Sequence, residues 1–269
     1  MAKDMHTHDE RLTRMVLTAM HDRLAMDPVP LDRPGDVPAL TAQLEGLITA
    51  EGTDPHRVME MWTDVLAPHV MSSDAVNFLA FIPAAPTKAA LLFDMLVSGS
   101  SIQGISALEA AGAIAAENQV LRLVADLAGM PASAGGVFVS GGSAGNLSAL
   151  TVARDAGRRT RELGRGDLTR IAVSDQAHSS IKNALSILDM AALVVPTENH
   201  VLTGPALAAA LDADPDAGNV VGVVATSGTT NAGIIDELAT IADVARARDL
   251  WFHVDGAYGG GGLFAPSVR

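Results

Sequence analysis

Four short polar segments each follow a run of apolar, β-prone residues. The segments are residues 140–146 (SGGSAGN), 174–180 (SDQAHSS), 226–231 (TSGTTN) and 253–258 (HVDGAY). The carboxyl ends of parallel strands lie at one edge of a sheet, and ligands bind at that edge. We therefore expect the four segments to lie close together and to form one binding site.

Residues 140–146 are suited to holding a phosphate. Their glycines leave backbone N–H groups accessible, and a helix expected at residues 147–161 would add the donors of its N-terminus. The segment has neither the G-x-G-x-x-G spacing of a dinucleotide-binding turn nor the Gly-Lys-Ser/Thr of a P-loop. The alternative is a tight strand-to-helix turn that binds nothing.

The other three segments supply an imidazole, hydroxyl groups and a carboxylate. His178 can stack on a ring, transfer a proton or ligate a metal, and residues 226–231 offer several hydroxyl groups. Asp255 would end a buried strand, where a carboxylate is costly to ionise unless a metal ion or a protonated nitrogen heterocycle meets it. The alternatives are a structural histidine, a capped turn and an aspartate that caps a helix.

Pyridoxal 5'-phosphate (PLP) is one cofactor that uses all four features. Its phosphate binds at a helix N-terminus, its ring stacks on an aromatic side chain, and a carboxylate keeps its pyridine nitrogen protonated. The protonated ring then accepts an electron pair from a bond of the substrate. We therefore expect PLP to be the cofactor.

The elements that must position these segments alternate between strands and helices. Runs of β-branched and apolar residues predict strands at residues 135–140, 169–174, 192–196, 220–226 and 250–254. Helical spacing predicts helices at residues 87–97, 107–128, 147–161, 179–188, 205–211 and 238–248. Short apolar strands that alternate with helices are typical of a parallel sheet in an α/β domain.

The N-terminal part has a different pattern. Helical spacing predicts helices at residues 9–25, 38–50 and 54–66. The proline-rich residues 26–38 between the first two helices form an extended linker. We therefore expect a helical arm at residues 1–75 and an α/β domain at residues 76–269. His6 and His8 in the arm are expected to be solvated, and no metal site is predicted.

Composition and charge exclude several classes of protein. The 269 residues include 18 basic and 31 acidic ones, and the net charge of −13 gives no general electrostatic reason to bind nucleic acid or an anionic membrane. There is no cysteine, which excludes disulfides, zinc–thiolate sites and a cysteine nucleophile. Neither a signal peptide nor an apolar run of the ~18–20 residues that span a bilayer is visible, so we expect a cytoplasmic protein.

Several blocks of the sequence resemble the PLP-dependent group II amino-acid decarboxylases of fold type I. The blocks are NFLAFIP at 77–83, ENQ at 117–119, LAGMP at 127–131, GVFVSGGSAGN at 136–146, SDQAHSS at 174–180, TSGTT at 226–230 and HVDGAY at 253–258. Members of this family include aromatic-L-amino-acid, tyrosine, glutamate and diaminobutyrate decarboxylases. The resemblance implies that residues 76–269 are an incomplete fold type I large domain, which follows a helical N-terminal arm.

The resemblance implies which residues bind the cofactor. Gly142 and Ser143 would hold the phosphate. His178 would stack on one face of the pyridine ring and take part in catalysis, and Ala257 would pack on the other face.

Two further roles and the reaction follow from the same resemblance. Thr230 would donate a hydrogen bond to the cofactor or to the substrate carboxylate, and Asp255 would pair with the pyridinium nitrogen. The enzyme would convert an L-amino acid into its amine and carbon dioxide. Members of the family are homodimers, so a homodimer is also expected here.

The blocks resemble different branches of the family. Residues 174–180 resemble the aromatic branch, whereas residues 140–146 resemble the glutamate and diaminobutyrate branch. Asn77 stands where many members have a His-Pro pair, and Ala84 stands where the aromatic decarboxylases have a threonine that contacts the substrate. An aromatic amino acid is therefore only slightly favoured as the substrate.

The lysine that links covalently to PLP in this family has no counterpart in the sequence. It would lie several dozen residues after the HVDGAY block, beyond Arg269, and Lys3, Lys88 and Lys182 do not match its position. We therefore expect these 269 residues alone to be inactive. The alternatives are another fold type I lyase, such as a sphingosine-phosphate-lyase-like or cysteine-desulfurase-like enzyme, and a non-catalytic remnant that binds PLP or only dimerises.

The resemblance also implies that residues 136–140 are an edge strand. The two strands beside it in fold type I would follow residue 269, so its nearest remaining strand would be ~14 Å away, which is three spacings of ~4.8 Å. Such a gap leaves backbone N–H and C=O groups unpaired. We therefore expect the chain to belong to a longer polypeptide or to pair with a second chain that completes the sheet.

Overall fold

The computed structural model describes residues 7–268 and divides the chain into two compact units. The first unit is Met1–Ile102 and the second is Gln103–Arg269. The division falls later than the expected domain boundary after residue 75, and the assignment of that boundary stays a prediction. No helix in the described part of the chain is long and apolar enough to span a lipid bilayer.

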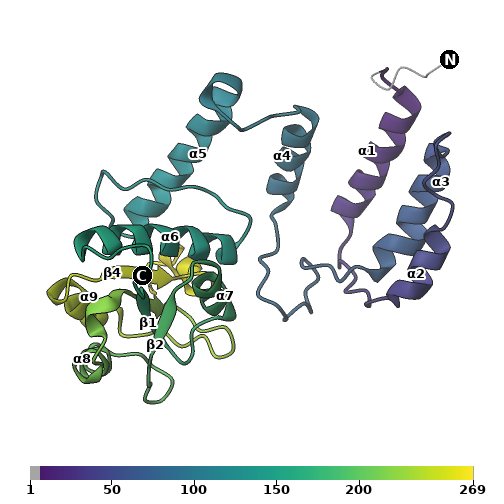
Figure 1. Cartoon of the computed structure of the whole chain (residues 1–269). Helices are drawn as coiled ribbons and strands as arrows, with labels where there is room; N and C mark the ends of the chain where they lie inside the picture. The colour runs from purple at the N-terminus through teal and green to yellow at the C-terminus, as the bar shows by residue number, and fades with distance from the viewer. Residues whose placement is uncertain (1–6, 269) are drawn as a thin grey trace. The chain divides into compact units, whose positions relative to one another are not determined.

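The first unit consists of short helices (Figure 1). They are α1 (Glu10–Ala25), α2 (Val37–Leu44), α3 (Pro55–Glu60) and α4 (Lys88–Gly99), with a π-helical turn (Met61–Leu66) and a 3-10 turn (Ala67–His69) after α3. Aspartate side chains accept hydrogen bonds from backbone N–H groups at the starts of α1, α2 and α3, as helix N-caps do. The helix expected at residues 38–50 ends at Leu44, because Glu45 leaves the helical conformation and Gly46 adopts a left-handed one.

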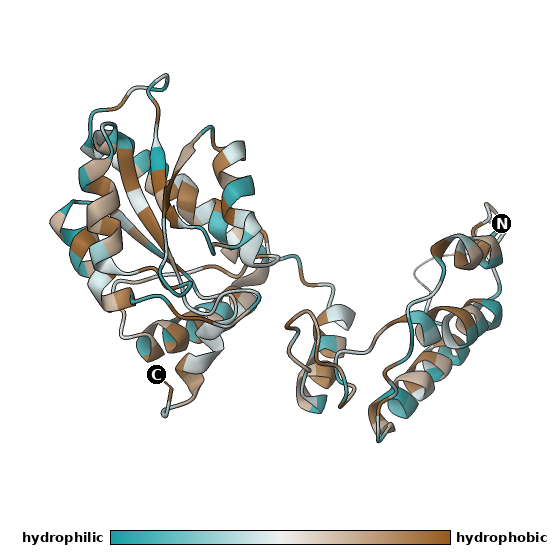
Figure 2. Cartoon of the chain, turned by 90° about the horizontal axis from the view of Figure 1, so that it is seen from below, coloured by the Kyte–Doolittle hydropathy of each residue, from teal (hydrophilic) through white to brown (hydrophobic). Residues whose placement is uncertain are grey.

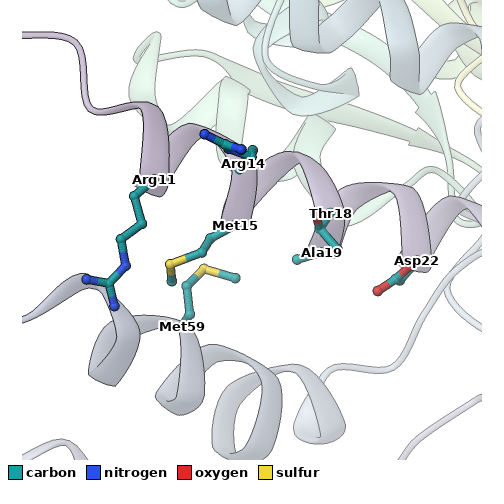
Figure 3. Close-up of a pocket in the computed structure, with 7 residues that line it drawn as sticks. All are labelled: Arg11, Arg14, Met15, Thr18, Ala19, Asp22 and Met59. Atoms are coloured by element: carbon teal, nitrogen blue, oxygen red, sulfur yellow. The ribbon is translucent and has the colours of Figure 1, made fainter.

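Little of the first unit is buried. Among its described residues, 7–102, Ala75 is the single buried one. Helices α1 and α3 line a groove in which Met15 points towards Met59 (Figure 3). Lys3 and His6 lie outside the described residues. The helices of this unit therefore obtain little stability from apolar burial of their own.

The second unit is built on a four-stranded parallel sheet. Its strands are β1 (Arg170–Ser174), β2 (Ala191–Val195), β3 (Val220–Thr226) and β4 (Trp251–Asp255), in the order β2-β1-β3-β4. Its helices are α5 (Ala107–Leu127), α6 (Gly142–Thr160), α7 (Ser179–Ile187), α8 (Gly204–Ala213) and α9 (Leu238–Ala247), with 3-10 turns at Ala217–Asn219 and Gly259–Phe264. The α/β class and the four strands predicted after residue 169 are confirmed.

Helices cover both faces of this sheet. Helices α6 and α7 pack on one face over a core that includes Leu150 and Ile171, and α8 and α9 pack on the other face over Ala172 and Ile241. Ile171 and Ala172 face opposite sides because successive side chains of a strand alternate. Figure 1 shows α6 and α8 on opposite sides of the sheet, and Figure 2 shows apolar strands between the helices. The central strands β1 and β3 are therefore buried between the helices, and their carboxyl ends are free to carry a site.

Residues 135–140 form no strand, so this prediction was wrong. Val137, Phe138 and Val139 are exposed, and the Phe138 N–H donates to Glu117 Oε1 at 3.1 Å. A strand requires hydrogen bonds to a neighbouring strand, and none of the four described strands pairs with this segment. A β-prone composition alone did not determine the structure here, because a strand also depends on its neighbour.

Candidate active site

The first predicted segment forms the start of helix α6. The helix was expected to begin at residue 147, but it begins at Gly142, because Gly141 makes the turn with a φ of +139° that other residues rarely adopt. Gly142 and Ser143 are exposed, and the first turn of the helix holds no acidic residue. The N–H groups of a first turn have no partners within the helix. This turn can therefore offer N–H donors and the Ser143 hydroxyl to an anion.

The first turn of α6 lies against the segment that follows β4. A Cβ atom on Gly142 would come within 3.3 Å of the Ala257 Cβ, so glycine allows the two backbones to approach closely. The Ala257 N–H in turn donates to Asp255 Oδ1 at 3.1 Å. Gly142 from one predicted segment thus meets Asp255 and Ala257 from another at the end of β4.

Asp255 is a buried carboxylate that has no cationic partner within the described residues 7–268. Its residue is 7% exposed, and its Oδ2 accepts a hydrogen bond of 2.9 Å from Asn146 Nδ2. None of the ion pairs among residues 7–268 includes Asp255. A buried carboxylate with neutral donors alone is well suited to meet a cation such as a protonated ring nitrogen.

His178 is connected to Asp255 through two intervening side chains. It is the N-cap of α7, and its Nδ1 accepts a hydrogen bond of 3.1 Å from the Ser180 N–H and lies 2.8 Å from Ser180 Oγ. Ser180 Oγ accepts a hydrogen bond of 3.0 Å from Asn146 Nδ2, which also holds Asp255. His178 itself is exposed, whereas Ser180 and Asn146 are buried. The histidine can therefore face a ligand while its inner nitrogen stays fixed.

His253 completes this chain of hydrogen bonds. It lies on β4, and its Nε2 is 2.8 Å from Asn146 Oδ1. Burial lowers the pKa of His253, and the nearby Asp255 carboxylate only partly opposes this effect. We expect a neutral imidazole at this position near pH 7.

We assigned no role to Asn146, Ser180 or His253 from the sequence, although all three lie in the polar segments. Two spacings in the sequence could have indicated Asn146 and His253. Asn146 follows Gly142 by four residues, so both lie on the same side of α6. His253 precedes Asp255 by two residues, so both side chains lie on the same face of β4.

Thr230 is exposed in the loop that follows β3. The base of this loop is fixed by Asp236, whose carboxylate accepts hydrogen bonds from the Thr226 N–H at 2.7 Å and the Leu202 N–H at 2.8 Å. Burial raises the pKa of Asp236, although the two N–H groups oppose this effect. Asp236 is thus a second carboxylate with a structural role that we did not predict.

The loop with Thr230 is also tied to the end of β4. The Ser227 N–H donates to the Asp255 carbonyl oxygen at 2.9 Å, and the Gly259 N–H donates to the Ser227 carbonyl oxygen at 2.8 Å. The structure therefore joins the segments with Gly142, His178, Asp255 and Ala257 by direct contacts. Thr230 belongs to a loop anchored beside them.

A family model described as the pyridoxal-dependent decarboxylase conserved domain matches residues 39–269. The chain belongs to the pyridoxal-dependent decarboxylase family. This confirms the family that the sequence blocks indicated, and PLP is its cofactor. The residues of this chain fit that cofactor, because they combine a glycine turn at a helix start, an exposed histidine and a buried carboxylate that pairs with no cation among residues 7–268.

Known proteins similar to this chain differ in the substrates that their names give. An aromatic-L-amino-acid decarboxylase of Bacillus atrophaeus is 32% identical over 89% of this chain and 49% of its own length. An L-2,4-diaminobutyrate decarboxylase of Rhizobium meliloti (strain 1021) is 38% identical over 65% of this chain and 36% of its own length. This chain thus spans about half the length, or less, of these curated relatives.

The fold agrees with a solved structure of the family. The crystal structure of 4-hydroxyphenylacetaldehyde synthase from Rhodiola rosea matches with a TM-score of 0.82 and 27% identity, over 96% of this chain and 58% of that one. The predicted fold type I large domain is therefore confirmed, and this chain holds a part of it.

Proposed function

We propose that this chain is the cofactor-binding part of a PLP-dependent decarboxylase that converts an L-amino acid into its amine and carbon dioxide. The observation that carries this proposal is the Asp255 carboxylate, buried at the end of β4 with neutral donors alone. Membership of the family supports PLP as the cofactor. The name of the Bacillus relative supports an aromatic substrate.

Each predicted residue has a task in this reaction. When bound, PLP supplies a ring that accepts the electron pair left on the substrate carbon as carbon dioxide departs. Asp255 keeps the proton on the pyridine nitrogen, because a buried carboxylate stabilises a nearby cation. Gly142 and Ser143 bind the phosphate with N–H groups and a hydroxyl. His178 and Ala257 enclose the ring from its two faces and exclude water from them.

Thr230 donates its hydroxyl to the cofactor or to the substrate carboxylate. This role is supported by its place in a loop anchored to the end of β4. Because Lys3, Lys88 and Lys182 do not match the position of the family's cofactor lysine, we propose that residues 1–269 alone do not turn over substrate. The complete enzyme acts as a homodimer.

The similarity to 4-hydroxyphenylacetaldehyde synthase favours a second candidate product. An enzyme with the same site could release an aldehyde instead of an amine. The two candidates share the loss of carbon dioxide, but aldehyde formation also consumes dioxygen and water and releases ammonia and hydrogen peroxide.

The experiment that tests this proposal measures all the products of the full-length protein. The protein is loaded with PLP and incubated separately with L-tryptophan, L-tyrosine, L-2,4-diaminobutyrate and L-glutamate. Carbon dioxide and amine in equal amounts from an aromatic amino acid would support the proposal. Aldehyde in place of amine would identify the second candidate. A PLP-loaded protein that releases no carbon dioxide from any of the four would refute both.

A further inference from the structure

Asn146 occupies the centre of a buried chain of polar side chains. Its own residue is 5% exposed, and its carboxamide contacts Asp255, Ser180 and His253 at once. A carboxamide has two N–H donors and one acceptor oxygen, so these three contacts use both donors and engage the acceptor. Any change of this group therefore alters several parts of the site together.

The orientation of the Asn146 carboxamide follows from its neighbours. The Asp255 carboxylate can only accept, so the NH2 group must face Asp255 Oδ2, and the same NH2 group reaches Ser180 Oγ. The carboxamide oxygen is then left for His253 Nε2, which must donate its proton. A rotated carboxamide would place an oxygen against the carboxylate and an NH2 group against the His253 N–H.

The same reasoning locates the proton of His178. The Ser180 N–H can only donate, so His178 Nδ1 must be an acceptor without a proton. Because Ser180 Oγ accepts from Asn146, its own hydrogen is available for His178 Nδ1. The neutral His178 ring therefore carries its proton on Nε2, the nitrogen that is not engaged by Ser180.

We propose that Asn146 is a positioning residue that orients the Asp255 carboxylate towards the cofactor. Its carboxamide donates to Asp255 directly and also donates to the Ser180 hydroxyl, whereas the Ser180 backbone N–H fixes the tautomer of His178. His253 locks the carboxamide in this orientation from β4. This inference rests on the proposed function for its catalytic meaning, because His178 and Asp255 are the residues assigned to the cofactor ring.

Substitutions can separate the contact of Asn146 with Asp255 from its contact with Ser180. Ser180→Ala removes the hydroxyl between Asn146 and His178 and leaves the contact between Asn146 and Asp255. Asn146→Ala removes both contacts. Ser186→Ala and Asn183→Ala, at exposed positions of α7, are the matched controls.

The test reads the tautomer of His178 in the full-length holoenzyme. Nitrogen-15 NMR of labelled histidine distinguishes a protonated Nε2 from a protonated Nδ1 and does not depend on turnover. We expect the wild type and both controls to show the Nε2–H form. Ser180→Ala should keep the Nε2–H form, because its backbone N–H still donates to His178 Nδ1, and should leave the PLP dissociation constant nearly unchanged. Asn146→Ala should also keep the Nε2–H form but should weaken PLP binding by about tenfold or more, because Asp255 loses its side-chain donor.

Two outcomes would overturn the inference. One is a wild-type His178 with its proton on Nδ1, and the other is a folded Asn146→Ala protein that binds PLP as tightly as the wild type. If Asn146→Ala does not fold, Asn146→Asp, which keeps the size of the side chain but turns a carboxylate oxygen towards Asp255, is used instead and should also weaken PLP binding. A protein with the expected tautomers but no decarboxylation would instead count against the proposed function.

Discussion

Asn146 and Asp255 are 109 residues apart in the sequence, yet a hydrogen bond of 2.9 Å joins their side chains at the buried end of the sheet. Asn146 lies on α6 and Asp255 ends β4, so this bond forms only when α6 has packed on the sheet and β4 has paired with β3. The candidate site is therefore a property of the whole second unit. Substitutions at either end of the bond should affect the same cofactor.

Asp255→Asn should abolish most of the activity of the full-length enzyme. An amide has no charge to keep a proton on the pyridine nitrogen, so we expect kcat to fall by about a hundredfold or more. Steady-state assays and the absorption spectrum of the bound cofactor measure this effect. Asp243→Asn, which removes an exposed partner of Arg246 on α9, is the control and should keep wild-type activity. An active Asp255→Asn enzyme would contradict the role given to Asp255.

The stability of the second unit should fall as the pH drops below about 6.5, the unfolded-state pKa of histidine. Burial lowers the pKa of His253 in the folded protein, so at pH values between the two pKa values the unfolded chain binds more protons. The contribution of neutral His253 is therefore complete above the unfolded pKa. It is lost as the pH falls from that value towards the folded pKa.

Urea unfolding followed by the fluorescence of Trp251 measures this effect, in a Trp62→Phe background that silences the other of the two tryptophans. The difference in unfolding free energy between the wild type and His253→Gln should shrink as the solution becomes more acidic. His200→Gln, at an exposed position, should show a difference that does not depend on pH. The same pH dependence in both variants would refute the assignment to His253.

Asp236→Ala should destabilise the second unit and loosen the loop that carries Thr230. It leaves the buried N–H groups of Thr226 and Leu202 without an acceptor, so we expect a loss of about 2–4 kcal/mol in unfolding free energy. Asp236→Asn keeps one acceptor oxygen and should lose less. Urea titration gives the free energies, and a PLP titration gives the effect on the loop. Equal losses in the two variants would argue against the hydrogen bonds as the cause.

Gly157→Ala should destabilise the contact between α6 and β3. A Cβ atom at this position would lie 2.3 Å from the Val221 Cβ, and such overpacking costs about 1–3 kcal/mol. Gly112→Ala on α5 is the matched control, because nothing lies within 4 Å of its new Cβ. That control should be neutral or more stable by up to about 1 kcal/mol. Val221→Gly removes the Val221 Cβ itself, so it should destabilise the Gly157→Ala protein less than it destabilises the wild type, as measured by urea unfolding.

The central elements of the fold were predictable because their signals are local. Strand β3 is an uninterrupted apolar run, and burial of every residue in it agrees with that pattern. The segment at 135–140 has a similar composition but forms no strand, since pairing depends on another part of the chain. The start of α6 was also predicted too late. The glycines at 142–146 suggested a turn, whereas in the structure Gly141 makes the turn and the helix begins at Gly142.

The candidate site was predictable in its segments but not in its connections. Gly142 and Ala257 were identified one by one, whereas their contact at the end of β4 depends on the tertiary fold. The same holds for Asn146, whose four-residue spacing from Gly142 is visible but whose contacts with Ser180 and Asp255 are not. Periodicity describes which side of an element a residue occupies, and it does not describe which element lies opposite.

Strand β3 is buried at all seven of its residues and is hydrogen-bonded to β1 on one edge and to β4 on the other. Amide protons in such a strand exchange with solvent only through the largest opening reactions of a protein, whereas an exposed first turn of a helix frays locally. The loop of Thr230 and its anchor Asp236 extend from the end of β3, while Gly142 and Ser143 lie in the exposed turn of α6. The two sides of the site therefore differ in lifetime: the exposed turn with Gly142 and Ser143 rearranges rapidly, and the end of β3 persists as long as the unit stays folded.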